Sequence, residues 1–218
     1  MEDIVFNYDY HRPFRWEMRV ERAAALKFLA ERIPAPEFIF DVVYRTQASL
    51  TGWDDSALEL PNDGYFELQH PEYTVAIDGS EDGGGFFALE CHGLEGWAAV
   101  ETVFLELLHV LKHCHIGRAH TVKALRADPR KLHPGIHFGN PNSRFWGFDW
   151  INYMCKVELD RNGGDALLQV PGLAEVRREM EGGYFRLCED YRQILDPNIV
   201  ARSQTAVRYW AELNGRFA

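Results

Sequence analysis

Residues 65–91 read YFELQHPEYTVAIDGSEDGGGFFALEC, and this stretch decides the fold class. It holds three short runs rich in aromatic and β-branched residues, a composition typical of β-strands. The runs are Tyr65–Leu68, Tyr73–Ile77 and Phe86–Cys91. A His-Pro-Glu break separates the first two runs, and the glycine-rich stretch 79–85 separates the last two, so both breaks are turn signals. The sequence therefore predicts an antiparallel meander in the middle of the chain.

The segments on either side of this meander carry further signals. Before it we expect a strand at Ile4–Tyr8, a helix from Phe14 to Arg32 and a strand at Phe38–Tyr44. After it, Trp97–Leu111 is the clearest helix of the chain, because its large apolar residues recur at helical spacing along one face. Strands and helices thus alternate in blocks through the first half of the chain.

The C-terminal third predicts a hairpin followed by a helix. The strands of the hairpin are expected at Val176–Met180 and Tyr184–Cys188, with the turn at Gly182-Gly183. The final helix begins at Asp196-Pro197 and ends at Asn214-Gly215, which are typical start and stop signals. The whole pattern predicts one α+β domain over residues 1–218, with a mostly antiparallel sheet (meander plus C-terminal hairpin) and helices packed against it.

Charge is distributed unevenly along the chain. The net charge is −10, but residues 46–111 hold thirteen Asp or Glu and no Lys or Arg. Residues 1–45 carry a net charge of −1, and residues 112–218 carry +4. A large acidic surface attracts cationic partners and repels nucleic acid and anionic membranes. The sequence therefore predicts a protein partner with a basic surface, and neither nucleic acid nor a membrane. In the alternative interpretation the acidic and basic blocks face each other inside the fold, where exposed salt bridges would contribute less than about 1 kcal/mol each.

The compartment and the redox state follow from what the sequence lacks. No run of apolar residues is long enough for a membrane span, and the start Met1-Glu2-Asp3 is acidic where a signal peptide is basic. The four cysteines form no CxxC pair, so they are expected to be small buried residues in a reducing compartment. We therefore expect a cytoplasmic protein.

One cluster of residues could support a metal-dependent enzyme. Glu106, His109 and His113 lie at i, i+3 and i+7 on the helix expected at 97–111, and carboxylate plus imidazole is a genuine metal-ligand set. A histidine near a helix C-terminus also interacts favourably with the helix dipole, which needs no metal. Nucleophile motifs such as GxSxG and phosphate-binding loops are missing. The sequence thus favours a protein with no catalytic residue and no cofactor, with the metal enzyme as the alternative.

Partner-binding residues are expected where acidic or aromatic side chains gather in loops. The acidic loops contribute Trp53, Asp54, Asp55, Glu81 and Asp82. Phe145 and Trp146 lie in residues 133–150 (HPGIHFGNPNSRFWGFDW), where glycine and proline alternate with aromatic residues. Large aromatic residues are common at the centres of interfaces, and they also fill the edge of a core, so both interpretations stay open.

The C-terminal part resembles a known class of proteins. It reads FWGFDWINYM from Phe145, then EVRREMEGGYFRLCED from Glu175, then the closing helix up to Leu213. This order resembles immunity proteins of bacterial polymorphic-toxin and type VI secretion systems, several families of which have a Trp-containing strand followed by a hairpin with a Gly-Gly turn. The resemblance implies an intracellular inhibitor that binds and neutralises a cognate, basic toxin. A structural subunit of a larger assembly is a third possibility, and the oligomeric state is open.

Overall fold

The computed structural model describes residues 4–10, 21, 24–25, 27–28, 37–42, 46–51, 64–70, 73–79, 85–91, 97–121 and 147–215. Its backbone contacts group into two compact units, Asp3–His115 and Ile116–Ala218. Each unit contains antiparallel strands and helices, so the predicted α+β fold class is confirmed. The expectation of one domain over residues 1–218 stays a prediction.

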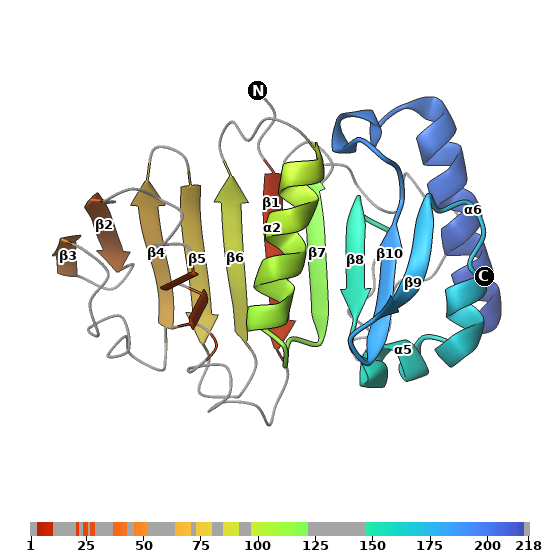
Figure 1. The fold of residues 1–218 in the computed structure, drawn as a ribbon, viewed down its shortest axis with the longest axis horizontal. Helices are drawn as coiled ribbons and strands as arrows, with labels where there is room; N and C mark the ends of the chain where they lie inside the picture. Colours follow the sequence, from red (N-terminus) through yellow and green to blue (C-terminus); the bar gives the residue numbers. More distant parts are fainter. Residues whose placement is uncertain are drawn as a thin grey trace. The chain divides into compact units, whose positions relative to one another are not determined.

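The first unit has six described strands. They are β1 (Ile4–Tyr10), β2 (Glu37–Val42), β3 (Thr46–Thr51), β4 (Gly64–His70), β5 (Tyr73–Gly79) and β6 (Gly85–Cys91). Neighbouring strands follow the order β3-β2-β4-β5-β6-β1, and each pair is antiparallel (Figure 1). The meander β4-β5-β6 is therefore confirmed, with His70 opposite Tyr73 and Gly79 opposite Gly85 at its two turns.

The flanking expectations in this unit also hold where the structure describes them. The predicted strand at Ile4–Tyr8 corresponds to β1, and the one at Phe38–Tyr44 corresponds to β2. Five residues of the helix expected at 14–32 are described, and all five are helical: Glu21, Ala24, Ala25, Lys27 and Phe28. The strand β3, with the polar sequence TQASLT, was not predicted.

Helix α2 (Trp97–Val110) covers one face of this sheet beside β1 (Figure 1). Phe104 on α2 contacts two residues of β1, with ring centroids 5.6 Å from Phe6 and 5.4 Å from Tyr8. The Tyr8 hydroxyl donates to the Phe104 carbonyl oxygen at 2.9 Å. All three side chains are fully buried, so this layer is the core of the unit, and the sheet has one face turned toward α2.

The second unit has four described strands in the order β7-β8-β10-β9, all antiparallel. They are β7 (Ile116–Thr121), β8 (Ile151–Met154), β9 (Glu175–Glu179) and β10 (Gly182–Arg186). The longer helical elements are α5 (Lys156–Arg161), the 3-10 helix η2 (Gly164–Gln169) and α6 (Pro197–Leu213), with a short 3-10 turn η3 (Tyr191–Gln193). Strands β7 and β8 and helix α5 were not predicted.

Helix α6 confirms its predicted ends. The carboxylate of Asp196 accepts a hydrogen bond from the backbone N–H of Asn198 at 2.8 Å, and Pro197 occupies the first turn. Gly215 follows the helix with a φ of +60°, a conformation that glycine adopts at little cost. The side chain of Arg202 donates to the Gly172 carbonyl oxygen at 2.7 Å, which joins α6 to the loop before β9.

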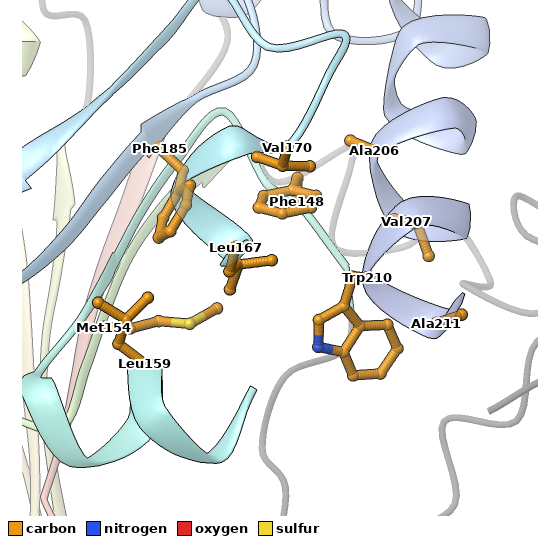
Figure 2. Packing of buried hydrophobic residues seen from close by; sticks show 10 residues of the cluster. All are labelled: Phe148, Met154, Leu159, Leu167, Val170, Phe185, Ala206, Val207, Trp210 and Ala211. Atoms are coloured by element: carbon orange, nitrogen blue, oxygen red, sulfur yellow. The ribbon is translucent and has the colours of Figure 1, made fainter. Parts of the chain in front are cut away.

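The core of the second unit lies between α6 and the sheet. The buried set is Phe148, Met154, Leu159, Leu167, Val170, Phe185, Ala206, Val207, Trp210 and Ala211. Figure 2 shows these side chains, with Ala206 on the side of α6 that lies toward Val170. Two residues of the aromatic segment 133–150 are described as buried, Phe148 and Trp150, so these two aromatic side chains fill the core.

Trp150 packs edge-on against Tyr191 and donates its indole N–H to the Cys188 carbonyl oxygen at 2.9 Å.

The predicted C-terminal hairpin is confirmed, but its turn is not where the glycines are. Strand β9 ends at Glu179 and β10 begins opposite it at Gly182, so the turn is the pair Met180-Glu181. The expected Gly-Gly turn was therefore wrong. Gly182 and Gly183 lie inside β10 because a side chain has no room there: a Cβ on Gly182 would lie 2.0 Å from the Met154 carbonyl oxygen, and one on Gly183 would lie 2.9 Å from the Phe185 ring.

The turn residue Met180 gives a first prediction. Its φ is +53°, a region that costs an L-residue roughly 1 kcal/mol, and glycine is the residue favoured at the first position of such a two-residue turn. Met180→Gly relieves that strain but adds freedom to the unfolded chain, so we expect a net gain in the free energy of unfolding of about 0.5 kcal/mol. Urea unfolding measures it. The control Glu181→Gly, at a position without positive φ, is expected to lower stability instead.

Candidate interaction surface

The two faces of the sheet in the first unit differ in composition. Directly opposite residues of antiparallel strands lie on the same face, so the register assigns every strand position to a face. One register line holds only apolar residues: Phe6, Leu89, Val75, Leu68, Phe40 and Ala48. Phe6 contacts Phe104 of α2, so this apolar face is the one that α2 covers.

Every acidic position of the six strands falls on the other face. We call these positions the acidic face: Asp9, Glu37, Asp41, Glu67, Asp78 and Glu90. None of the six strands contains a Lys or an Arg. The six positions belong to β2, β4, β5, β6 and β1, which are consecutive neighbours in the strand order. In the part of the unit that is described, α2 lies on the opposite side, and the charge of this face has a single sign.

The register also brings two acids directly opposite each other. Asp41 on β2 pairs with Glu67 on β4. Like charges at directly opposite positions destabilise an antiparallel pair, by an amount of the order of 0.2–1 kcal/mol. The six described strands of this unit contain no Lys or Arg. A like-charge opposition of this kind favours a cation beside it, and a cationic partner at this face would supply one.

The residues predicted from the sequence for partner binding lie outside the described residues. This applies to all seven of them: Trp53, Asp54, Asp55, Glu81, Asp82, Phe145 and Trp146. The acidic face was missed because the charge count treated residues 46–111 as a block. Counting charges at every second residue of each strand would have found the acidic face, because Glu67, Asp78 and Glu90 lie between apolar or glycine neighbours. The other three acids, Asp9, Glu37 and Asp41, lie before residue 46 and were outside the acidic segment 46–111.

The proposed metal ligands occupy different local environments. Helix α2 ends at Val110, so His113 lies in the following turn rather than on the helix with Glu106. His109 is exposed, and its Nδ1 lies 2.7 Å from the Leu105 carbonyl oxygen. His113 contacts the buried carboxylate of Glu21 twice, through Nδ1 at 2.5 Å and through its backbone N–H at 3.2 Å. Within the described ranges, no group of three or more His, Cys, Asp or Glu side chains could hold a metal ion.

In the second unit, charged side chains of both signs alternate across the end of the sheet. Arg177 on β9 bonds to Glu175 and Glu179 on the same strand. Arg186 on β10 bonds to Glu175 at 2.8 Å and also to Glu189. The Arg177 guanidinium lies 3.9 Å from the centre of the Tyr184 ring, a cation–π contact. This ion-pair chain is nearly neutral, unlike the acidic face of the first unit.

Glu175 gives the second prediction. Burial raises the pKa of Glu175, but the hydrogen bonds from Arg186 and Arg177 outweigh it and hold the pKa below its ordinary value. A carboxyl group whose pKa is lower in the folded than in the unfolded protein stabilises the fold at pH values above its unfolded-state pKa, which is about 4.3 for Glu. This contribution to stability is lost as the pH falls through the folded-state pKa. The difference in unfolding free energy between wild type and Glu175→Gln should be constant from about pH 7 to 5 and shrink below about pH 4. Urea unfolding across this range measures it, with Glu181→Gln in the exposed turn as the control.

The thiols of the second unit are poorly suited to nucleophilic chemistry. Burial raises the pKa of Cys188 to about 11, and its Sγ lies 3.2 Å from the Asp190 carbonyl oxygen. Burial also raises the pKa of Cys155, at the start of α5. A thiol must lose its proton to act as a nucleophile, so both are largely protonated at neutral pH. Cys155 and Cys188 are free cysteines in the structure.

Comparison with known proteins gives a fold relationship. No protein-family model and no curated protein matches the chain. Among solved structures, the chain is similar to the T6SS protein PA0821 of Pseudomonas aeruginosa, with a TM-score of 0.53. The alignment covers 98% of this chain and 84% of the Pseudomonas protein, at 12% sequence identity. At that identity the likeness shows a shared fold. Separately, none of the described helices has the length and apolar character needed to cross a membrane.

Proposed function

We propose that this protein is an intracellular immunity protein that binds a cognate, basic toxin through the acidic face and neutralises it. The observation that carries the proposal is the placement of six acidic positions on one face of the six described strands of the first unit, which contain no Lys or Arg. An inhibitor needs complementary charge and no catalytic group, because it works by occupying its target. A single-sign surface of this kind raises the association rate with a cationic partner by factors of about 10 to 1,000.

Two further observations support the proposal. Asp41 and Glu67 occupy directly opposite positions of the same sign, an arrangement that a cationic partner would relieve. The structural neighbour from Pseudomonas aeruginosa is named as a T6SS protein. The C-terminal part of the sequence resembles immunity proteins of type VI secretion systems, which protect a cell against the toxins of such systems. The proposal places this chain in such a system.

The experiment begins with the products of the genes that flank the gene for this chain. Each product is expressed in a host cell with and without this protein. We expect one of them to be a basic protein that stops growth when it is expressed alone and to bind the purified chain with at least micromolar affinity. If no flanking product is toxic or bound, the proposed function is wrong.

A matched pair of variants then tests the surface. The double variant Glu67→Gln/Asp78→Asn removes two charges from the acidic face, and Glu101→Gln/Glu106→Gln removes two from α2, on the opposite side of the sheet. Because both variants have the same net charge, a non-specific charge effect changes them equally. We expect the first to slow association with the toxin at least about tenfold at low salt, and the second to change it less than about twofold. Equal effects would contradict docking at the acidic face.

A further inference from the structure

Each unit ends in a strand that is paired on one side within the described residues. In the first unit β3 pairs with β2, and in the second β9 pairs with β10; no other described strand pairs with either. An open strand edge presents unpaired backbone N–H and C=O groups, to which a strand of another chain can add. Natural proteins protect such edges with charged residues, proline or bulges, so the composition of an edge indicates whether pairing is avoided.

The two end strands differ sharply in this respect. Strand β9 reads EVRRE, and in an antiparallel pairing with a second copy Glu175 would lie opposite Glu179 and Arg177 opposite Arg177. Such like-charge pairs oppose edge-to-edge association. Strand β3 reads TQASLT, with no charged residue and no proline, and it is paired with β2 at all six positions. In an antiparallel pair, every second residue of a strand directs its backbone N–H and C=O groups away from the paired strand. About three residues of β3 therefore present these groups to an incoming strand.

The acidic face determines which strand fits this edge. On that face Gln47, Ser49 and Thr51 of β3 lie opposite Asp41, Ile39 and Glu37 of β2. A strand added to β3 would lie about 10 Å from β2, within reach of long basic side chains directed to Asp41 and Glu37. A second copy of this chain, paired through its own β3, would bring no basic position near Asp41 and Glu37, because β3 contains no Lys or Arg. A segment with Lys or Arg at alternate positions is attracted.

We propose that the outer edge of β3 accepts an extended segment of the toxin as an additional antiparallel strand, with Lys or Arg at alternate positions above the acidic face. This rests on the proposed function and makes it more specific: backbone hydrogen bonds fix the register of the partner, and the carboxylates select its charge. It also explains why an uncharged edge strand lies beside strands whose acidic positions all share one face.

The test uses the full-length protein and two synthetic heptapeptides. One alternates Lys and Val, and the other has the same lysines with Pro in place of Val, so it keeps the charge but cannot form a ladder. Isothermal titration at low salt measures both. We expect the Lys-Val peptide to bind at least tenfold more tightly than the Lys-Pro peptide. Equal affinity, or no binding of either, overturns strand addition.

Proline substitutions in β3 locate the binding edge. The N–H groups of neighbouring residues point to opposite sides of a strand, so one of Ala48→Pro and Ser49→Pro breaks the ladder with β2 and the other removes an outward donor. The variant that keeps the wild-type melting temperature is the informative one. We expect it to lose at least fivefold in affinity for the Lys-Val peptide. Unchanged affinity would overturn the proposal. A second outcome would also overturn it: if light scattering shows that the wild type is a dimer and that this variant is not, a second copy of the chain occupies the edge.

Failure of this inference is distinguishable from failure of the proposed function. If the folded proline variant binds the toxin as tightly as wild type while Glu67→Gln/Asp78→Asn still slows association, the toxin docks on the acidic face without adding a strand. If no flanking gene product is a toxin but the peptides differ as expected, the edge accepts basic strands and the immunity function is wrong.

Discussion

Replacing Gly182 with alanine should lower the free energy of unfolding by at least about 3 kcal/mol. The new Cβ would lie 2.0 Å from the carbonyl oxygen of Met154, which is a backbone atom and cannot move without its strand. Strand β10 must therefore shift away from β8, although β10 is central in the order β7-β8-β10-β9 and pairs on both sides. The fully buried Tyr184 and Phe185 would shift with it. Urea unfolding followed by tryptophan fluorescence measures the loss.

The control for this prediction is Gly164→Ala at the start of η2. Gly164 has a φ of +61°, and a Cβ there would meet no atom within 4 Å. Its expected loss is about 1 kcal/mol, from the backbone conformation alone. If the two variants lose similar stability, the close approach of β10 to Met154 is not what requires a glycine at position 182.

The second large effect is expected at Asn162, which joins α5 to α6. Its side chain accepts from the Trp210 indole N–H at 3.0 Å and donates to the Glu158 carbonyl oxygen at 2.7 Å. Its own carbonyl oxygen accepts from the Asn214 side chain at 3.0 Å. Asn162 is 1% exposed, so water cannot replace these bonds easily. Asn162→Ala removes the acceptor of a buried indole, and we expect it to lower the free energy of unfolding by about 3 kcal/mol.

A double-mutant cycle isolates the bond between Asn162 and Trp210. Trp210→Phe removes the indole donor and keeps an aromatic ring in the core. If the hydrogen bond contributes as the geometry indicates, Asn162→Ala should cost about 1 kcal/mol less in the Trp210→Phe background than in wild type. Additive losses would show that Asn162 acts through the end of α5 and not through the indole. Asn214→Ala, which removes only the bonds from the end of α6, is expected to cost about 1 kcal/mol.

The parts of the fold that could be predicted are those with local signals. The meander followed from turn residues between β-prone runs, and the ends of α6 followed from Asp196, Pro197 and Gly215. Strand β7 (IGRAHT) was missed because Gly and Ala are depleted in strands, and its pairing with β8 supplies what the local sequence does not. Gly182 was misassigned for a similar reason: its role depends on Met154, which is distant in the sequence.

The acidic character of the candidate site could be expected from the sequence, whereas its strand positions could not. The count of acidic residues indicated a cationic partner, and the contacts expected in loops around Asp54 and Glu81 stay a prediction, because those loops lie outside the described residues. The acidic face depends on strand register, which brings together Asp9, Asp41 and Asp78 from three separate parts of the sequence. A charge count along the chain cannot show which carboxylates become neighbours in a sheet.

The opposition of Asp41 and Glu67 has a consequence for how dissolved salt acts on this protein. Dissolved ions weaken both the repulsion between two carboxylates and the attraction between a carboxylate and a basic partner. At physiological ionic strength the screening length is about 8 Å. Added salt should therefore make the free sheet harder to unfold while it slows the capture of a basic protein. A basic partner of the kind proposed would relieve the same repulsion that salt screens, so its stabilising effect should be largest in dilute solution.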